Sequence, residues 1–301
     1  MNIIGAGMSG CLAGIMYPEA TIYESSDIPP INHNAVLRFR SNIISQATGI
    51  PFKKVKVRKG IFSEGKFVKP NILLCNKYSY KVLNLYTDRS IWNIDTVERF
   101  IAPIDFQQQL FNLVKDRVIL DHPIDSYDLL MDLLGNKTIS TIPLPKLAEI
   151  LEIDLPFETQ YKKIVTAKFE VKDCNTYQTI YYPDWNKNVY RATITGNELI
   201  IESTEEIEIT DINYVLDTFG IFANYEKKTT VKKYNSLGKI ADVDDMQRKQ
   251  LLYHITNKFN IYSAGRYAIW KNILMDDVLK DLRVIKEMIA ANDYDRMRMS
   301  K

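Results

Sequence analysis

Cysteine is scarce in this chain of 301 residues. The three cysteines are Cys11, Cys75 and Cys174, and no two of them form a CxxC pair. This spacing predicts neither a metal site nor a disulfide scaffold, so free thiols in a reducing cytosol are expected. An excess of charge of either sign is missing too, because the formal net charge is +2. A nucleic-acid partner is therefore possible but has no support from bulk charge.

Long apolar runs are also missing, since no stretch approaches the length that spans a bilayer. No basic leader precedes the first apolar strand, which begins at residue 2. These two absences predict a cytoplasmic protein without a membrane anchor. The length favours two lobes, or one domain with a large insertion, over a single core.

Glycine is concentrated near the N-terminus, where an apolar strand at residues 2–4 is followed by a G-x-G-x-x-G turn and a helical run of small residues. The turn reads Gly5-Ala6-Gly7-Met8-Ser9-Gly10. In this pattern the first glycine permits a tight turn, the second lets a pyrophosphate approach the backbone, and the third lets the helix lie close to the sheet. The anion rests on N–H groups at the helix N-terminus.

A second strand ends at Glu24, which follows Gly5 by 24 − 5 = 19 residues. At this distance an acidic side chain receives the hydroxyls of a ribose. The whole stretch therefore predicts a dinucleotide site. The alternative is an ordinary α/β protein with a glycine-rich helix start, in which Glu24 is a solvated strand end. The stretch does not distinguish NAD from FAD.

Residues 35–40 alternate in polarity and predict a strand that carries Arg38 and Arg40. Two cations downstream of a phosphate-binding turn could approach a pyrophosphate or an anionic substrate. The alternative is an exposed strand face. Residues 53–60 alternate with lysine and arginine, and a solvated strand face is favoured there over a site for polyanions.

The pattern changes twice along the chain. Residues 51–99 and 151–239 are rich in alternating strands, including an aromatic strand predicted at residues 78–86, and are interpreted as a substrate domain. The remaining segments, 1–50, 100–150 and 240–301, form one discontinuous nucleotide-binding domain. Its last part predicts a strand, a Gly-Arg turn and a long helix whose apolar residues recur at helical spacing.

Four segments resemble the flavin-dependent amine oxidase superfamily and its relative UDP-galactopyranose mutase. They are GAGMSGCLAG with Glu24, the strand at 117–120, the strand and prolines at 139–145, and GRYAIW at 265–270 with the helix start at 275–277. The resemblance implies an α/β fold with a Rossmann-type, GR2-like FAD-binding domain. An antiparallel β-rich substrate domain is inserted into it.

The resemblance also implies which residues hold the cofactor. Val118 lies in a segment that is similar to the family's strand against the adenine. Thr141 lies in a segment that looks like the family's strand-to-proline segment near the dinucleotide. The turn at Gly265 and Arg266 is similar to one that approaches the pyrophosphate and ribityl chain.

The start of the last helix looks like the part of the family that faces the flavin. Asp276 would accept hydrogen bonds from ribityl hydroxyls, and backbone N–H groups near Met275 would stabilise charge at the N1–O2 edge of the flavin. This C-terminal motif favours FAD over NAD, because a nicotinamide cofactor that dissociates after each turnover does not need C-terminal contacts to hold its far end.

Candidates for the chemistry are fewer. His33 lies in the loop where the family approaches the flavin, although a histidine on the surface of a loop is the favoured interpretation. Arg191 is a candidate for gripping a carboxylate or phosphate, and Trp270 for closing the pocket near the flavin.

The sequence thus predicts an FAD-dependent oxidoreductase of amine-oxidase type. It would oxidise a C–N or similar bond of a small or nucleotide-linked substrate by hydride transfer. The alternatives are a non-redox flavoenzyme resembling the mutase and a nucleotide-binding protein without catalysis.

Overall fold

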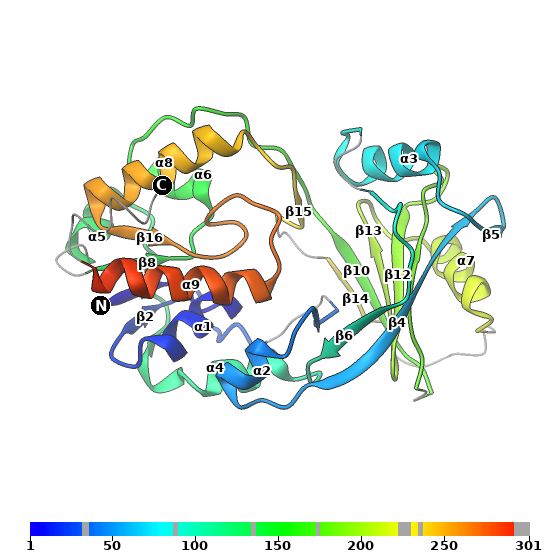
Figure 1. Cartoon of the computed structure of the whole chain (residues 1–301), viewed down its shortest axis with the longest axis horizontal. Helices are drawn as coiled ribbons and strands as arrows, with labels where there is room; N and C mark the ends of the chain where they lie inside the picture. The colour runs from blue at the N-terminus through cyan, green and yellow to red at the C-terminus, as the bar shows by residue number, and fades with distance from the viewer. Residues whose placement is uncertain are drawn as a thin grey trace.

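A five-stranded parallel sheet forms the first lobe, at the left of Figure 1, in the computed structural model of the chain. The structure describes residues 1–31, 36–86, 90–133, 137–172, 175–221, 230–233 and 237–291. The strand order is β16-β8-β1-β2-β7. The strands are β1 (Asn2–Ile4), β2 (Thr21–Tyr23), β7 (Val118–Ile119), β8 (Thr138–Ser140) and β16 (Ile261–Ser263). The order reverses beside β1, and ligands of open parallel sheets bind at the carboxyl ends of the strands at such a point.

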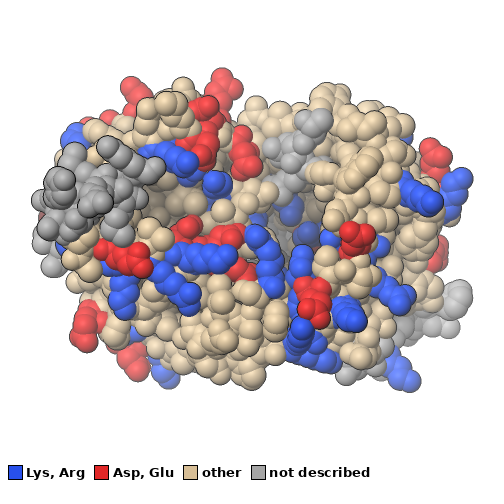
Figure 2. Space-filling model, viewed as in Figure 1, with Lys and Arg blue, Asp and Glu red and all other residues tan. Residues whose placement is uncertain are grey.

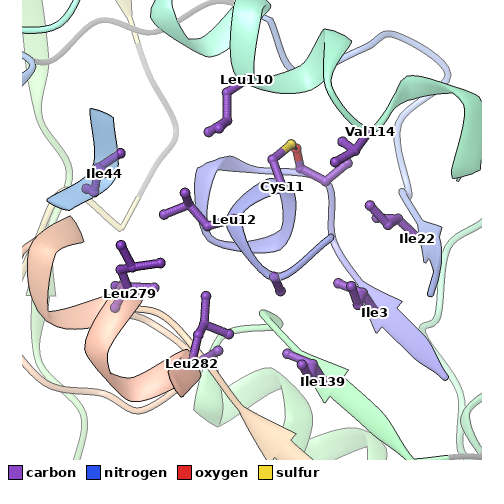
Figure 3. Close-up of a cluster of buried hydrophobic side chains, with 14 of the residues drawn as sticks. Ile3, Cys11, Leu12, Ile22, Ile44, Leu110, Val114, Ile139, Leu279 and Leu282 are labelled. Carbon is purple, nitrogen blue, oxygen red and sulfur yellow. The ribbon is translucent and has the colours of Figure 1, made fainter. Parts of the chain in front are cut away.

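Helices cover both faces of this sheet. They are α1 (Met8–Met16), α2 (Ile43–Thr48), α4 (Phe106–Asn112) and α9 (Met275–Ala290) on one face, and α5 (Tyr127–Leu133), α6 (Leu144–Ile150) and α8 (Asp245–Phe259) on the other. Strand β1 alternates between them, since Ile3 packs in the first cluster and Ile4 in the second. Around α1, the side chains of Leu12, Leu279 and Leu282 converge (Figure 3). This packing fixes the N-termini of α1 and α9 relative to the sheet.

A nine-stranded mixed sheet forms the second lobe, at the right of Figure 1. Its order is β14-β10-β13-β12-β11-β4-β6-β3, and β5 pairs with β4. The strands are β3 (Arg38–Phe39), β4 (Lys53–Ser63), β5 (Lys66–Val68), β6 (Val97–Ile101), β10 (Val165–Glu170), β11 (Tyr177–Tyr181), β12 (Val189–Thr195), β13 (Glu198–Ser203) and β14 (Thr230–Lys233). The short elements η1 (Lys115–Arg117), β9 (Tyr161–Lys162) and β15 (Lys239–Ile240) complete the described chain.

The two faces of the second sheet differ in character. Helix α7 (Ile209–Phe219) covers one face, where Ala192 and Ile194 of β12 pack beneath it. The alternate residues Arg191, Thr193 and Thr195 point to the opposite face, because successive side chains of a strand do so. This second face, which we call the cleft face, is turned toward the first lobe.

Helix α3 (Ile72–Leu83) is held to the second lobe by a buried lysine. The Lys81 ammonium donates hydrogen bonds to the carbonyl oxygens of Tyr182 at 2.9 Å, Asp184 at 2.8 Å and Val189 at 2.6 Å. Burial lowers the pKa of Lys81 to about 7, against the opposing effect of nearby Asp184 and Asp211. The lysine therefore joins a helix to two strand ends through main-chain atoms alone.

The predicted fold class is confirmed: a Rossmann-type parallel sheet carries an inserted β-rich lobe. The inserted sheet is mixed rather than wholly antiparallel, since β4 and β11 pair in parallel. The aromatic strand predicted at residues 78–86 is wrong, because residues 72–83 form α3. Asn71 caps this helix by accepting from the N–H of Leu74 at 3.0 Å, and Leu74, Tyr78 and Val82 are buried at a spacing of four. Within the described ranges, no helix is long and apolar enough to cross a membrane.

Candidate functional site

The glycine turn after β1 has the close packing that its sequence predicts. Gly5 has a φ of +92°, and a Cβ there would overlap the Thr141 hydroxyl, which donates to the Ile4 carbonyl at 2.8 Å. A Cβ on Gly10 would lie 2.9 Å from the carbonyl carbon of Gly5 and closer still to its oxygen. At Gly7, in contrast, a Cβ would meet no atom within 4 Å. Gly5 and Gly10 are therefore required by the fold, whereas Gly7 borders open space.

That open space lies at the N-terminus of α1. Gly7 is the N-cap and has no side chain to cap the helix. The first N–H groups of a helix have no partner within it and carry the positive end of its dipole. A phosphate group therefore fits the space that the missing side chain of Gly7 leaves beside Met8 and Ser9.

Glu24 lies at the edge of the same turn. Its carboxylate accepts hydrogen bonds from the N–H of Ala6 at 2.7 Å and of Ser26 at 3.1 Å. The Ser25 hydroxyl also donates to the oxygen that Ser26 contacts, at 3.2 Å, so the second acceptor site of the other oxygen, Oε2, is the one with capacity for a ribose hydroxyl. Burial, and then the charge of Glu24, raises the pKa of Cys11 to about 12, so this neighbouring thiol is not a nucleophile.

The Gly-Arg turn near the C-terminus lies against the start of α1. A Cβ on Gly265, whose φ is +106°, would approach Ser9 Oγ to 2.7 Å. The Arg266 guanidinium donates to the Ile273 carbonyl at 3.1 and 2.9 Å and so closes the loop that precedes α9. The structure thus brings the two predicted ends of the cofactor site together, while a contact of Arg266 with a pyrophosphate stays a prediction.

The N-terminus of α9 is tied to the segment after β3. The buried Asp276 carboxylate accepts from the N–H of Arg40 at 3.1 Å, the N–H of Ser41 at 2.9 Å and the Ser41 hydroxyl at 2.6 Å. Asp277 accepts from the Arg40 guanidinium at 2.6 Å. Met275 opens the helix and packs against the core of the first lobe. Asp276 therefore positions residues 40–41, and its contact with a ribityl chain stays a prediction.

The other predicted residues lie at different depths. Val118 is partly buried in β7, where it is the register partner of Ile22 of β2, the strand that precedes Glu24. Trp270 is 1% exposed and packs in the core on the α8 face of the first sheet, with its ring 6.4 Å from that of Tyr161. His33 lies outside the described residues.

Arg191 lies on the cleft face in a network with two buried partners. Its guanidinium donates to both carboxylate oxygens of Glu202, at 2.6 Å for Nη2, and the Tyr190 hydroxyl donates to Glu202 at 3.0 Å. Despite burial, Arg191 holds the pKa of the Glu202 carboxyl below its usual value. Arg191 is thus fixed by a charge of opposite sign.

Arg38 extends from β3 onto the same face. Its guanidinium donates to the Thr179 hydroxyl at 3.0 Å and to the Ile194 carbonyl at 2.7 Å. Its Nε is buried and has no hydrogen-bond partner among the described residues. Burial, followed by the charge of Arg191, lowers the pKa of Arg38 to about 10. Arg38 is therefore a partly buried cation whose hydrogen bonds with described residues go to neutral groups.

A cavity of about 220 Å³ lies where the first lobe meets the cleft face. Leu37, Ala102 and Pro103 line one side, and Tyr177 and Ile200 line the other. Figure 2 shows Lys and Arg side chains along the hollow between the lobes. This cavity was not predicted from the sequence.

Two charged residues of the sheet, Lys168 and Glu198, also line the cavity and lie 3.7 Å apart. Polar residues at every second position of β10 and β12, and Glu198 and Glu202 of β13, were the available signal. A solvated strand face gives the same pattern, so the sequence alone does not separate the two cases.

The fold is shared with solved structures of low sequence identity. A mutant putrescine oxidase with redesigned cofactor binding has a TM-score of 0.56 and 10% identity, covering 96% of this chain and 98% of its own. The PF1083 protein from Pyrococcus furiosus has a TM-score of 0.54 and 9% identity, covering 93% of this chain and 95% of its own. A mutant of MHPCO has a TM-score of 0.53 and 9% identity, covering 95% and 82%. No family model and no curated protein matches the sequence. At these identities the likeness shows the two-lobed fold alone.

Proposed function

We propose that this chain is an FAD-dependent oxidoreductase that takes a hydride from a C–N or similar bond of a small or nucleotide-linked substrate. The open space at Gly7 is its main support, because it lies at an uncapped helix N-terminus beside a fixed acidic side chain. In this proposal residues 1–50, 100–150 and 240–301 form the cofactor domain. The rest of the chain forms the substrate domain.

FAD is favoured over NAD because the segment that leads into α9 lies against the start of α1. The turn before α9 packs on the first turn of α1 through Gly265 and Ser9. The positive end of α1 suits a pyrophosphate, and that of α9 suits the electron-rich edge of a flavin. The shared fold with putrescine oxidase, an amine oxidase by its name, supports oxidation of a C–N bond.

Each part of the chain then has a defined task. The N–H groups of Met8 and Ser9 bind phosphate oxygens, and Glu24 orients the ribose. Asp276 keeps residues 40–41 against α9, and the cleft face of the second sheet orients the substrate. When bound, FAD supplies the acceptor for two electrons, which no side chain of the protein provides.

The absorption spectrum of the purified protein, followed by that of the supernatant after denaturation, tests the proposal. Two bands of oxidised flavin that are released by denaturation are the expected result. Bleaching of these bands by a substrate without oxygen would support the redox reaction. Turnover only after prior reduction of the flavin would instead identify a non-redox flavoenzyme. A colourless protein that fails to bind added FAD would refute the proposal and leave NAD or a binding role.

A further inference from the structure

We propose that the cleft face of the second sheet is an oxyanion site, and that the substrate carries a carboxylate or phosphate group which binds there. The identity of the ligand as a substrate rests on the proposed function. The oxyanion site itself rests on four cationic side chains and does not depend on FAD.

The four cations lie on one face of the sheet. Lys59 of β4 is the register partner of Thr179 of β11, so both point to the same side as Arg38, which bonds to Thr179. Arg99 of β6 is the partner of Val55, which is on the same face as Lys59 because their positions differ by four. Arg191, two residues before Thr193, completes the group on β12.

Only part of this charge is balanced. Among the described residues, Glu202 is the one carboxylate in an ion pair with these four cations, and its partner is Arg191. The ammonium of Lys59 contacts the Asn93 carbonyl at 3.4 Å, and the Arg99 guanidinium donates to the Glu98 carbonyl at 2.7 Å. Both of these acceptors are neutral backbone oxygens.

The cations also act on one another. Burial is the main cause that lowers the pKa of Arg38 and of Lys59, and the charge of Arg99 lowers both further, while Asp95 opposes this effect at Lys59. Like charges that are held together in a partly buried place favour the arrival of an anion, which removes their repulsion.

Arg38 is the strongest single indication. The guanidinium is partly buried, and its buried Nε has no hydrogen-bond partner among the described residues, so one donor of its planar fork is unsatisfied there. Carboxylate and phosphate oxygens match this fork, whereas an ammonium group would be repelled. Residues next to Arg38, namely Leu37 and its strand partner Ile101, line the 220 Å³ cavity. The cavity can therefore take an apolar part of the same ligand.

Calorimetric titration tests this inference, with inorganic phosphate and acetate as separate probes and chloride as the control for ionic strength. The protein is used with its flavin bound. If a preparation holds no flavin, the titration is made without added nucleotide, and the variants below distinguish binding on the cleft face from binding at the glycine turn, so that failure of the proposed function does not obscure the result. Saturable binding of phosphate or acetate is expected, and the better probe identifies the class of oxyanion.

Variants of two partly exposed residues place the binding on the cleft face. Lys59→Gln and Arg99→Gln should each weaken binding about tenfold or more, which corresponds to losing one charge-assisted interaction. Lys56→Gln and Arg58→Gln are matched controls, because these exposed residues lie on the opposite face of the same strand β4. The controls should change the affinity less than twofold. Arg38→Lys, which keeps the charge and loses the fork, should also weaken binding. Absence of saturable binding, or equal effects in test and control variants, would overturn the proposal.

Discussion

Replacing Gly7 and Gly10 by alanine, one at a time, separates the two roles of the glycine turn. The two residues are three positions apart in one motif, yet a Cβ on Gly10 would approach the Gly5 backbone to 2.9 Å or less, while a Cβ on Gly7 would meet nothing within 4 Å. The first substitution should therefore affect folding. The second should affect only the ligand.

The size of each effect follows from these contacts. Gly10→Ala gains about 1 kcal/mol of helix propensity. It also forces a side chain against backbone atoms that cannot move separately, which costs about 3 kcal/mol at the upper end for overpacking. The net loss of about 2 kcal/mol should lower the melting temperature by about 4–8 °C in a chain of this size. Gly7→Ala should stay within about 0.5 kcal/mol of wild type, because its φ of −62° and ψ of 178° suit alanine.

The ligand should respond in the opposite order. The methyl group of Gly7→Ala occupies the space where a phosphate would approach the N–H groups of α1, so FAD should bind about tenfold to a hundredfold more weakly, or about 1.4–2.8 kcal/mol. Melting followed by circular dichroism on flavin-free protein measures the first effect, and quenching of flavin fluorescence on titration measures the second. Wild-type FAD affinity in Gly7→Ala would refute the phosphate site, and a wild-type melting temperature in Gly10→Ala would refute the packing argument.

Three further changes test other parts of the structure. Lys81→Met leaves three buried carbonyl groups without their donor and should cost about 3 kcal/mol in urea unfolding. Because the pKa of Lys81 is about 7 in the folded protein and about 10.5 when unfolded, the unfolded chain holds more protons between these values. Stability should then rise with pH from about 7 to 10.5, by at most about 1.4 kcal/mol per unit, and this rise should vanish in Lys81→Met. Glu202→Gln leaves the Arg191 charge unbalanced, and denaturant titration should show a loss of about 2 kcal/mol, reduced from the fully buried case because Arg191 is partly exposed. Asp276→Asn replaces a carboxylate that accepts from the main chain of Ser41, and should lower stability by about 1–2 kcal/mol in the same assay, with Asp281→Asn on the same helix as the control.

Local geometry explains why the nucleotide-binding turn could be predicted from the sequence. The strand, the turn at residues 5–10 and the helix are contiguous in sequence. The atoms that leave no room for a Cβ at Gly5 and Gly10 belong to this stretch or to the segment after the neighbouring strand β8. Helix α9 was predictable for a related reason, since its apolar residues recur at helical spacing along one face.

The second lobe was less predictable because its contacts are distant in sequence. Tyr78 and Tyr80 alternate as in a strand, yet the Asn71 cap and the burial of Tyr78 with Leu74 make this segment helical. Arg38 was expected near an anion, but only the structure places its guanidinium on Thr179, 141 residues away. Such contacts depend on which strands pair in the sheet, and a local sequence pattern does not determine that pairing.

The parallel pair of β4 and β11 has a consequence for how this chain is made. Arg58 and Gln178 are partners in the ladder, with 178 − 58 = 120 residues between them. During synthesis the edge of β4 that pairs with β11 stays unpaired while the ribosome adds the strands β7 and β8 of the first lobe. Unpaired strand edges of this kind can pair with strands of other chains, and charged side chains, especially lysine, oppose such pairing. We therefore expect the exposed basic residues of β4 to reduce such pairing in the nascent chain.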